Sequence, residues 1–209
     1  GLAALAKVLP GNVTHVAHGT TVATNGLLEG KGARAVLITN SGFEDLLQLR
    51  RQNRPNIYDL FPSPRPPLIP RTQTLGLVGR LRHDGSTHTE QEDLAAFIQT
   101  HHELLASAES FAVCLLHSYA NPVHEQQVGA ALTAAFPGVP LTLSSRISPL
   151  SREYERAETT AANAFIAPVM TRYIGKLRAD IAPAELSVMD SAGGRLTVQG
   201  ALKEPVRTA

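Results

Sequence analysis

Cysteine is nearly absent from this chain of 209 residues, because Cys114 is the only one. A single cysteine excludes an intrachain disulfide and is typical of a reducing compartment, so we expect a cytoplasmic location. The residue lies in the apolar run FAVCLL, which indicates a buried strand. We expect Cys114 to be a small buried hydrophobic residue, because reactive cysteines occupy exposed, electropositive places.

The sequence also lacks an excess of charge and a long apolar run. Its 19 Lys and Arg residues and 18 Asp and Glu residues give a net charge of +1 and a pI near 8.2. This balance, without a long run of either sign, predicts neither a nucleic-acid partner nor a membrane surface. The apolar runs are far shorter than the roughly 20 residues that span a bilayer. Residues 1–10 lack a basic segment and a cleavage signature, and we interpret them as the end of an amphipathic helix rather than a signal peptide.

Motifs for metal binding and for serine hydrolysis are missing as well. The chain has eight histidines but no CxxC or HExxH spacing. We therefore predict no metal site. No GxSxG motif occurs that would indicate a serine nucleophile.

What the sequence does contain is an alternation of strand and helix patterns. The strand-like segments are 13–18, 34–39, 111–117, 139–144 and 186–190. The helical patterns lie near 20–30, 43–50, 90–106, 123–136 and 153–180. This alternation predicts an α/β fold with a largely parallel sheet.

Prolines suggest where the chain is divided. Six of the fourteen lie within residues 55–71, where no regular element is expected. We predict an amino-terminal α/β segment over 1–71, an inserted α/β subdomain over 72–150, and a helix and strand that return to the core over 151–209. Asp84-Gly85 predicts a hairpin turn. Pro168 predicts a kink or a break in the last long helix, because a proline removes a backbone donor and clashes with the preceding turn.

The stretch HGTTVATNGLLEGKG, residues 18–32, places a threonine-rich turn between a strand pattern and a helix pattern. Orphan N–H groups at such a helix start favour anions, and Gly19 allows a close approach to the backbone. Thr20, Thr21 and Asn25 can add hydrogen bonds from their side chains. Plain helix capping is the alternative interpretation.

Two further polar groups are candidates for substrate binding. Arg51, Asn53 and Arg54 lie in the stretch RRQNRPNIYDL, and guanidinium groups bind carboxylates and phosphates through two parallel hydrogen bonds. A solvated basic loop is the alternative. Glu153, Arg156, Thr160 and Asn163 recur at helical spacing and can share one face. An intrahelical ion pair between Glu153 and Arg156 would be the simpler explanation of that pair.

The segment HSYANPVHEQQVG, residues 117–129, joins a strand pattern to a helix pattern. Asn121-Pro122 predicts a helix N-cap followed by proline at the first helical position. His117 ends the strand, where α/β sheets place ligands, although a structural hydrogen bond is the alternative role.

Two long blocks of the sequence resemble a known family. HGTTVATNGLLEGKGARAVLITNSGFEDLLQLRRQNRPNIYDL and PVHEQQVGAALTAAFPGVPLTLSSRISPLSREYERAETTAANAFIAP are similar to the hydantoinase A and 5-oxoprolinase family. The resemblance implies an actin-like (ribonuclease H-like) nucleotidase architecture with the α/β subdomain inserted. Members usually open with an Asp-Gly-Gly-Thr hairpin and continue into a Gly-rich nucleotide loop. This chain has neither, so the resemblance indicates a fragment.

The resemblance also implies roles for residues. MDSAGG, residues 189–194, is similar to a Ser-Asn-Gly-Gly segment beside the nucleotide cleft, which makes Gly193 and Gly194, with Gly19, candidates for cofactor binding. Ala192 replaces the usual Asn, and Gly30 stands where an Arg is common, so the substrate is open. An RQNRP string in the family strengthens the case for Arg51, Asn53 and Arg54.

The function implied is a part of an ATP-dependent hydrolase subunit that opens a hydantoin or 5-oxoproline ring by phosphorylating the amide oxygen. ATP and Mg²⁺ are the implied cofactors of the full-length protein, and none is expected to bind this fragment tightly. A second, B-type subunit or domain is the implied partner, and we expect an oligomer at full length. The alternatives are a subunit of an ATP-dependent ketone carboxylase, of the acetone or acetophenone type, and a non-catalytic recognition and assembly module.

Overall fold

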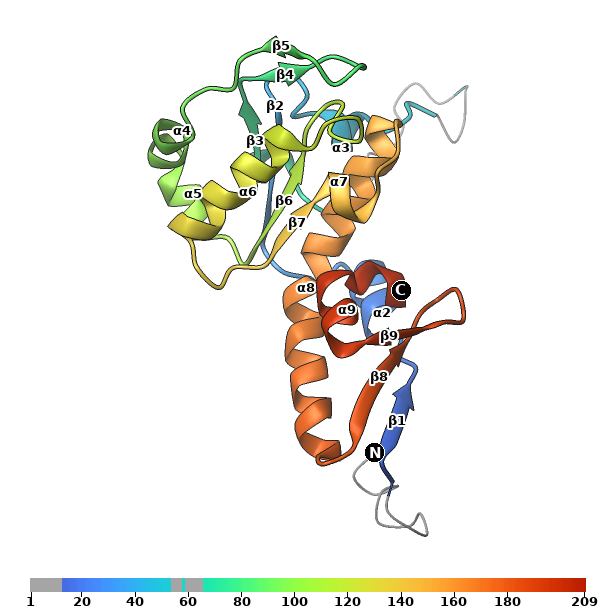
Figure 1. Cartoon of the computed structure of the whole chain (residues 1–209). Coiled ribbons are helices and arrows are strands. Elements are labelled where there is room, and N and C mark those ends of the chain that lie inside the picture. Colours follow the sequence, from blue (N-terminus) through green and yellow to red (C-terminus); the bar gives the residue numbers. More distant parts are fainter. Residues whose placement is uncertain (1–12, 54–57, 59–65) are drawn as a thin grey trace. The chain divides into compact units, whose positions relative to one another are not determined.

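The computed structural model describes residues 13–53, 58 and 66–209, and the chain forms two compact units (Figure 1). Unit 1 comprises Gly1–Ala33 and Ile166–Ala209, and unit 2 comprises Arg34–Phe165. This division differs from the predicted boundaries after residues 71 and 150, because strands on both sides of residue 71 pair in one sheet. The expected helix end over residues 1–10 lies outside the described residues.

A parallel sheet of four strands forms the centre of unit 2, in the order β3-β2-β6-β7. All three pairings are parallel, and every residue of β2 and β6 is buried. Parallel sheets are covered on both faces, which explains the continuous apolar runs in these strands. The bounds are β2 (Ala35–Asn40), β3 (Thr74–Leu77), β6 (Ser110–Cys114) and β7 (Leu141–Leu143). The predicted α/β class with a largely parallel sheet is confirmed, and Cys114 is buried as expected.

Helices cover the two faces of this sheet (Figure 1). One face packs with α4 (Leu94–Thr100), α5 (His102–Ala106) and α6 (Val123–Ala135), which bury Phe97, Leu105, Val128 and Leu132. The other face packs with α3 (Leu46–Leu49) and the start of α8 (Glu153–Ile181). That start contributes only alanines to the buried cluster, so the helix approaches the sheet closely.

The expected helix over 90–106 begins later than its pattern indicated and is interrupted. Asp93 caps α4 by accepting a hydrogen bond from the backbone N–H of Ala95 at 2.9 Å. His101 separates α4 from α5. The predicted hairpin is confirmed: β4 (Arg80–Leu81) pairs with β5 (Thr87–Thr89), and Gly85 in the turn has φ +83°.

Pro168 does not break the last long helix, since α8 runs without interruption from Glu153 to Ile181. A proline leaves the carbonyl four residues earlier, here that of Ala164, without its helical donor. The buried hydroxyl of Ser110 donates to this carbonyl at 2.7 Å. A residue of β6 therefore supplies the hydrogen bond that the proline removes.

Ser110→Ala is expected to destabilise the 209-residue chain by about 1–3 kcal/mol, because the Ala164 carbonyl would be buried without a donor. Ser107→Ala is the matched control, since its hydroxyl donates to the Leu104 carbonyl at 2.7 Å at an exposed position. Urea unfolding measures both variants. Equal losses in the two variants would contradict the role given to Ser110.

Unit 1 contains a sheet of three strands in the order β1-β8-β9. β1 (His15–His18) pairs in parallel with β8 (Glu185–Met189), which pairs in antiparallel fashion with β9 (Arg195–Thr197). α2 (Val22–Leu28) follows β1, and α9 (Val198–Lys203) follows β9. The other short elements among the described residues are α7 (Ser144–Ile147) in unit 2 and two 3₁₀ turns, Arg71–Gln73 and Pro205–Thr208.

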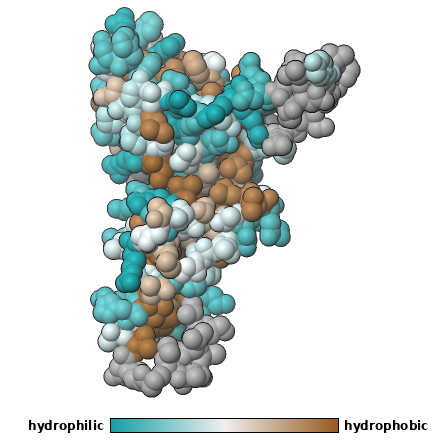
Figure 2. Space-filling model, turned by 90° about the vertical axis from the view of Figure 1, so that its right-hand side faces the viewer, coloured by the Kyte–Doolittle hydropathy of each residue, from teal (hydrophilic) through white to brown (hydrophobic). Residues whose placement is uncertain are grey.

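The surface is mixed in character. On the face seen in Figure 2, brown hydrophobic residues form groups separated by teal and white ones. Exposed apolar residues in this pattern are normal for folded proteins. Among the described residues, no helix has the length and apolar character needed to cross a bilayer.

Candidate functional site

The carboxyl ends of β2 and β6 form a topological switch point in unit 2. The chain leaves β2 toward α3 on one face of the sheet and leaves β6 toward α6 on the other. In open α/β sheets, ligands bind outside the carboxyl ends of the strands where the connections diverge in this way.

Asn40, at the end of β2, ties the loops at this edge together. Its side-chain carbonyl accepts from the backbone N–H of Leu116 at 2.6 Å, and its side-chain amide donates to the Gly79 carbonyl. The side chain is 3% exposed. Asn40 therefore fixes the segments after β3 and β6 against β2.

Arg156 lies beneath this edge and is fully buried. Its guanidinium donates to the Ser118 hydroxyl at 2.9 Å and to the Leu115 carbonyl at 2.8 Å. It also lies 5.4 Å from the ring centroid of Tyr119. The first turn of α8 is thereby bound to the segment that follows β6.

Glu125, also fully buried, carries the opposite charge. Its carboxylate accepts from the backbone N–H groups of Leu115 at 2.9 Å and Ser145 at 2.8 Å, and from the Ser144 hydroxyl at 2.5 Å. The hydroxyl oxygens of Ser144 and Ser118 are 3.1 Å apart, so two serines connect the carboxylate with Arg156. We call Arg156, Ser118, Ser144 and Glu125 the buried charge network.

His117 and Tyr119, which are half-buried, lie on the solvent side of this network. Their side chains approach at 3.3 Å, from the ring nitrogen Nδ1 to the phenol oxygen. His117 has φ +59°, a backbone conformation that costs free energy for a residue other than glycine. Burial lowers the pKa of His117, the charge of Glu153 raises it, and Arg80, Arg156 and His83 lower it further.

The lowered pKa of His117 predicts a dependence of stability on pH. The folded-state pKa lies below the unfolded value of about 6.5, so the unfolded state binds more protons once the pH falls below about 7. The unfolding free energy is expected to fall over this range and to be independent of His117 above it. Urea unfolding at several pH values measures the slope. His117→Asn, which tolerates the positive φ, should reduce the slope, and the exposed control His102→Gln should not.

In unit 1, the carboxyl ends of β1 and β8 also lie at one edge. His18 is in register with Val188, and a Cβ added at Gly19 would lie 3.6 Å from the sulfur of Met189. The turn after β1 and the turn between β8 and β9 therefore meet at this edge. Gly193 has φ +89°.

Asp190 shapes the turn between β8 and β9. Its carboxylate accepts from the backbone N–H of Ala192 at 2.8 Å and from Arg207 at 3.0 and 2.6 Å. The hydrogen bond with Ala192 and the contact with Arg207 hold the pKa of Asp190 below its usual value. The carboxylate is engaged on both sides, while Ser191, Ala192, Gly193 and Gly194 are exposed.

Comparison with known proteins assigns both parts of the sequence to one family. Residues 2–136 match the hydantoinase/oxoprolinase N-terminal region, and residues 156–209 match hydantoinase/oxoprolinase. The chain belongs to the hydantoinase/oxoprolinase family.

Individual relatives of this family member are enzymes by name. Caprolactamase subunit alpha of Pseudomonas jessenii is 34% identical over 78% of this chain and 24% of its own length. The crystal structure of the ATP-dependent caprolactamase from that organism matches 94% of this chain and 30% of its own, with a TM-score of 0.82 and 30% identity. The 5-oxoprolinase of Saccharomyces cerevisiae is 32% identical over 88% of this chain and 16% of its own length.

Acetone carboxylase in its nucleotide-free structure shares the fold. It matches 92% of this chain and 30% of its own, with a TM-score of 0.73 and 22% identity. The hydantoinase/oxoprolinase chain thus spans less than a third of the length of each of these relatives.

The candidate residues on α8 differ from one another in burial. Arg156 and Asn163 share a face as expected, but this face is buried against the sheet. The side-chain amide of Asn163 donates to the Thr142 hydroxyl at 3.0 Å. Arg156 donates to the segment after β6, and the contacts of these described side chains include no ion pair with Glu153. Glu153 itself is half-buried near His117.

The predicted basic cluster is only partly described. Arg51 forms an ion pair with Glu155 at the start of α8, and Asn53 is exposed. Arg54 lies outside the described residues. The cluster's role in substrate binding stays a prediction.

The predicted threonines make local hydrogen bonds at the start of α2. The Thr20 hydroxyl accepts from the backbone N–H of Val22 at 3.1 Å, and the Thr21 hydroxyl accepts from the Asn25 amide at 3.5 Å. Each hydroxyl, as an acceptor in these contacts, retains its proton for another partner. Thr21, the N-cap residue of α2, makes no side-chain capping hydrogen bond, and the local contact of Thr20 with the first N–H of the helix is compatible with ligand binding.

Sequence reasoning missed Glu125, Ser144 and the contact between His18 and Tyr173. The ring nitrogen Nε2 of His18 lies 2.5 Å from the Tyr173 hydroxyl, and burial lowers the pKa of His18. These partners are far apart in sequence, so no local spacing indicates them. The connection between buried Glu125 and Arg156 through two serines depends on how the strands pair, which a local sequence pattern does not indicate.

Proposed function

We propose that this chain is part of an ATP-dependent enzyme that hydrolyses a ring amide of the 5-oxoproline, lactam or hydantoin type. The observation that carries the proposal is the similarity to ATP-dependent caprolactamase over 94% of the chain. Similarity to 5-oxoprolinase, named for another lactam, supports the same class of substrate.

The chemistry explains why such an enzyme needs anion-binding turns rather than a strong nucleophile. An amide carbon is a poor electrophile, and phosphorylation of the amide oxygen by ATP gives it a good leaving group. We assign the binding of phosphate oxygens to the unit 1 edge, formed by Gly19, Thr20 and Thr21 with Gly193 and Gly194. Backbone N–H groups and hydroxyls stabilise developing negative charge when they are fixed in advance.

The turn at Gly193 fits such a role. Nothing lies within 4 Å of a Cβ added at Gly193, so its backbone is open to a ligand. The described residues contain no group of three or more His, Cys, Asp or Glu side chains positioned to hold a metal ion. We assign no Mg²⁺ ligand to these residues.

Substrate recognition is assigned to Arg51, Asn53 and Arg54 in unit 2. Asn25, in α2 of unit 1, is a separate candidate. Guanidinium groups suit a carboxylate or an imide. We also assign a contact with substrate to Glu153, whose charge acts on His117, and a positioning role to the buried Arg156 and Asn163. In the whole protein we propose an actin-like architecture, a cytoplasmic location, an oligomer, and a second subunit as partner, as the name of caprolactamase subunit alpha suggests for that relative.

The test uses the full-length enzyme with its partner subunit and measures phosphate release from ATP. Addition of 5-oxoproline, caprolactam or hydantoin should stimulate release and yield the ring-opened product. Stimulation only by acetone with bicarbonate would favour a ketone carboxylase, which the shared fold with acetone carboxylase makes the second candidate.

Calorimetric titration addresses the third possibility, a non-catalytic module. Mg-ATP is expected to bind the 209-residue chain weakly, because most of the charge-stabilising contacts of such a nucleotide cleft come from loops and a metal-binding aspartate that this chain does not supply. Micromolar binding would place the nucleotide site within these residues. Absence of ATP use by the full-length assembly would favour the module.

A further inference from the structure

A groove of about 510 Å³ opens in unit 2 between the β4–β5 hairpin, the segment leading to α4, and the first turn of α6. Its volume lies within the range of about 300–1,000 Å³ that is typical of small-molecule sites. None of its lining residues belongs to the buried charge network or to the unit 1 edge. They are Thr87, Glu90, Gln91, Glu92, Leu94, Val123, His124 and Gln127.

His124 lines this groove and is only 7% exposed. Within the described part of the chain, no group forms a hydrogen bond with its imidazole, and its ring nitrogens are not among the fully buried atoms that lack a partner, so they are accessible from the groove. Burial lowers the pKa of His124, while the charge of Glu90 raises it. A neutral imidazole has one nitrogen that accepts a hydrogen bond.

The charges around the groove are negative. Glu90 and Glu92 contribute carboxylates, and no lysine or arginine lines the groove. One oxygen of Glu92 accepts from the backbone N–H of Val78 at 2.6 Å, which fixes this side chain and leaves its other oxygen for a ligand. The amide of Gln91 donates to the His124 carbonyl at 3.4 Å, which joins the segment before α4 to α6.

We propose that this groove binds a small alkylammonium cation. Its three N–H donors point in different directions and suit three separate acceptors, which are the carboxylates of Glu90 and Glu92 and the imidazole of His124. Leu94 and Val123 provide the apolar wall for the alkyl stem.

This site is independent of the proposed ring-opening function. It requires neither ATP nor a second subunit, and it concerns residues outside the edges assigned to substrate and phosphate. The 209-residue chain is therefore sufficient for the test.

The test titrates n-butylammonium chloride into the isotope-labelled chain and follows by NMR the side-chain amide signals of Gln91 and Gln127, which line the groove. Saturable shifts are expected, with n-butanol and sodium chloride giving none. Glu90→Gln should weaken binding about tenfold, which corresponds to the loss of one charge-assisted hydrogen bond. His124→Gln should weaken it as well.

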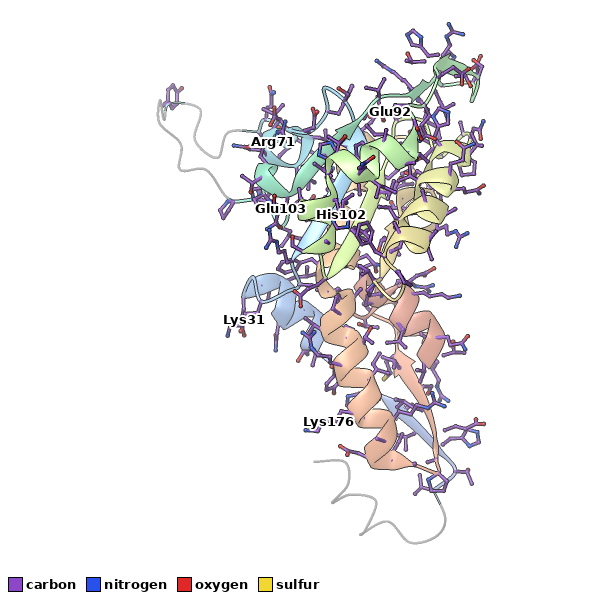
Figure 3. The ribbon with its side chains drawn as sticks, turned by 90° about the vertical axis from the view of Figure 1, so that its left-hand side faces the viewer. Lys31, Arg71, Glu92, His102, Glu103 and Lys176 are labelled. Carbon is purple, nitrogen blue, oxygen red and sulfur yellow. The ribbon has the colours of Figure 1, made fainter. Side chains whose placement is uncertain are left out.

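Glu103→Gln is the matched control. The exposed carboxylate of Glu103 in α5 lies away from Glu92 (Figure 3), and its replacement changes the net charge by the same amount. Binding by Glu103→Gln should equal that of the unaltered chain. Equal shifts with n-butanol, or unchanged affinity in Glu90→Gln, would overturn the proposal.

Discussion

Replacement of Arg156 by methionine is expected to lower the unfolding free energy of the chain by about 3–5 kcal/mol. The guanidinium is fully buried and compensates the charge of Glu125 through two serine hydroxyls. Without it, the carboxylate remains in the interior with no opposite charge. The Leu115 carbonyl also loses a donor. Urea unfolding measures the loss.

Arg152→Met is the matched control, because this exposed arginine precedes the same helix. Its effect should stay within about 0.5 kcal/mol, as is usual for surface substitutions. A second test adds Glu125→Gln to Arg156→Met, which removes the uncompensated charge and should restore part of the stability. Independent, additive losses in the double variant would show that the two charges are not coupled.

This network shows how stability and the site are connected in unit 2. Glu125 accepts from the segment after β6 and from the segment after β7, and Arg156 binds the first of these to α8. The same segment continues into His117, whose backbone is strained. A strained residue persists only where its surroundings fix it, and the buried charges provide that restraint.

The sequence predicted the elements of this site better than their contacts. Hydrophobic periodicity predicted α6 and α8 and three strands of the parallel sheet, β2, β6 and β7, because each depends on residues close in sequence. It did not predict β3 as a separate strand. Periodicity also predicted that Arg156 and Asn163 share a face. Which face is buried depends on Ser118 and Thr142, which other strands bring to the helix.

Pro168 also shows that contacts between residues distant in sequence limit what a local pattern can predict. Local rules correctly state that a proline frees a carbonyl, and from this alone a kink or a break is expected. The partner of that carbonyl, Ser110, lies 54 residues earlier. Ser110 and Ala164 do not occur together in any short stretch of the sequence. The continuity of α8 at Pro168 therefore depends on tertiary packing.

The turns of unit 1 could be predicted from the sequence, because they depend on properties of single residues. Glycine tolerates unusual backbone angles, and threonine forms local hydrogen bonds. Gly193 has a positive φ, and Thr20 accepts a hydrogen bond two residues ahead. That these turns meet follows from the parallel pairing of β1 with β8, whose strands are separated by most of the chain. Their role toward a ligand requires a functional test.

Replacing Thr20 and Thr21 together by valine in the full-length enzyme is expected to lower kcat by about 10²–10³-fold, as losses of fixed donors to a developing anion do. Valine keeps the shape of threonine and removes the hydroxyl. Both hydroxyls act as acceptors toward their neighbours, from Val22 and Asn25, so their protons are available to a phosphate oxygen. Steady-state kinetics of ATP-dependent ring opening measures the effect.

The stability of the same double variant separates the two interpretations of this turn. Loss of a capping hydroxyl alone costs about 1 kcal/mol and leaves activity nearly intact in the folded fraction. Thr14→Val is the control, because this exposed threonine precedes β1, at the opposite end of the strand from Thr20, and should change neither quantity. A fall in melting temperature with kcat unchanged would assign Thr20 and Thr21 to the helix start alone. A fall in kcat with the melting temperature nearly unchanged would assign them to the site, because the fold would then have lost little while the reaction lost its anion donors.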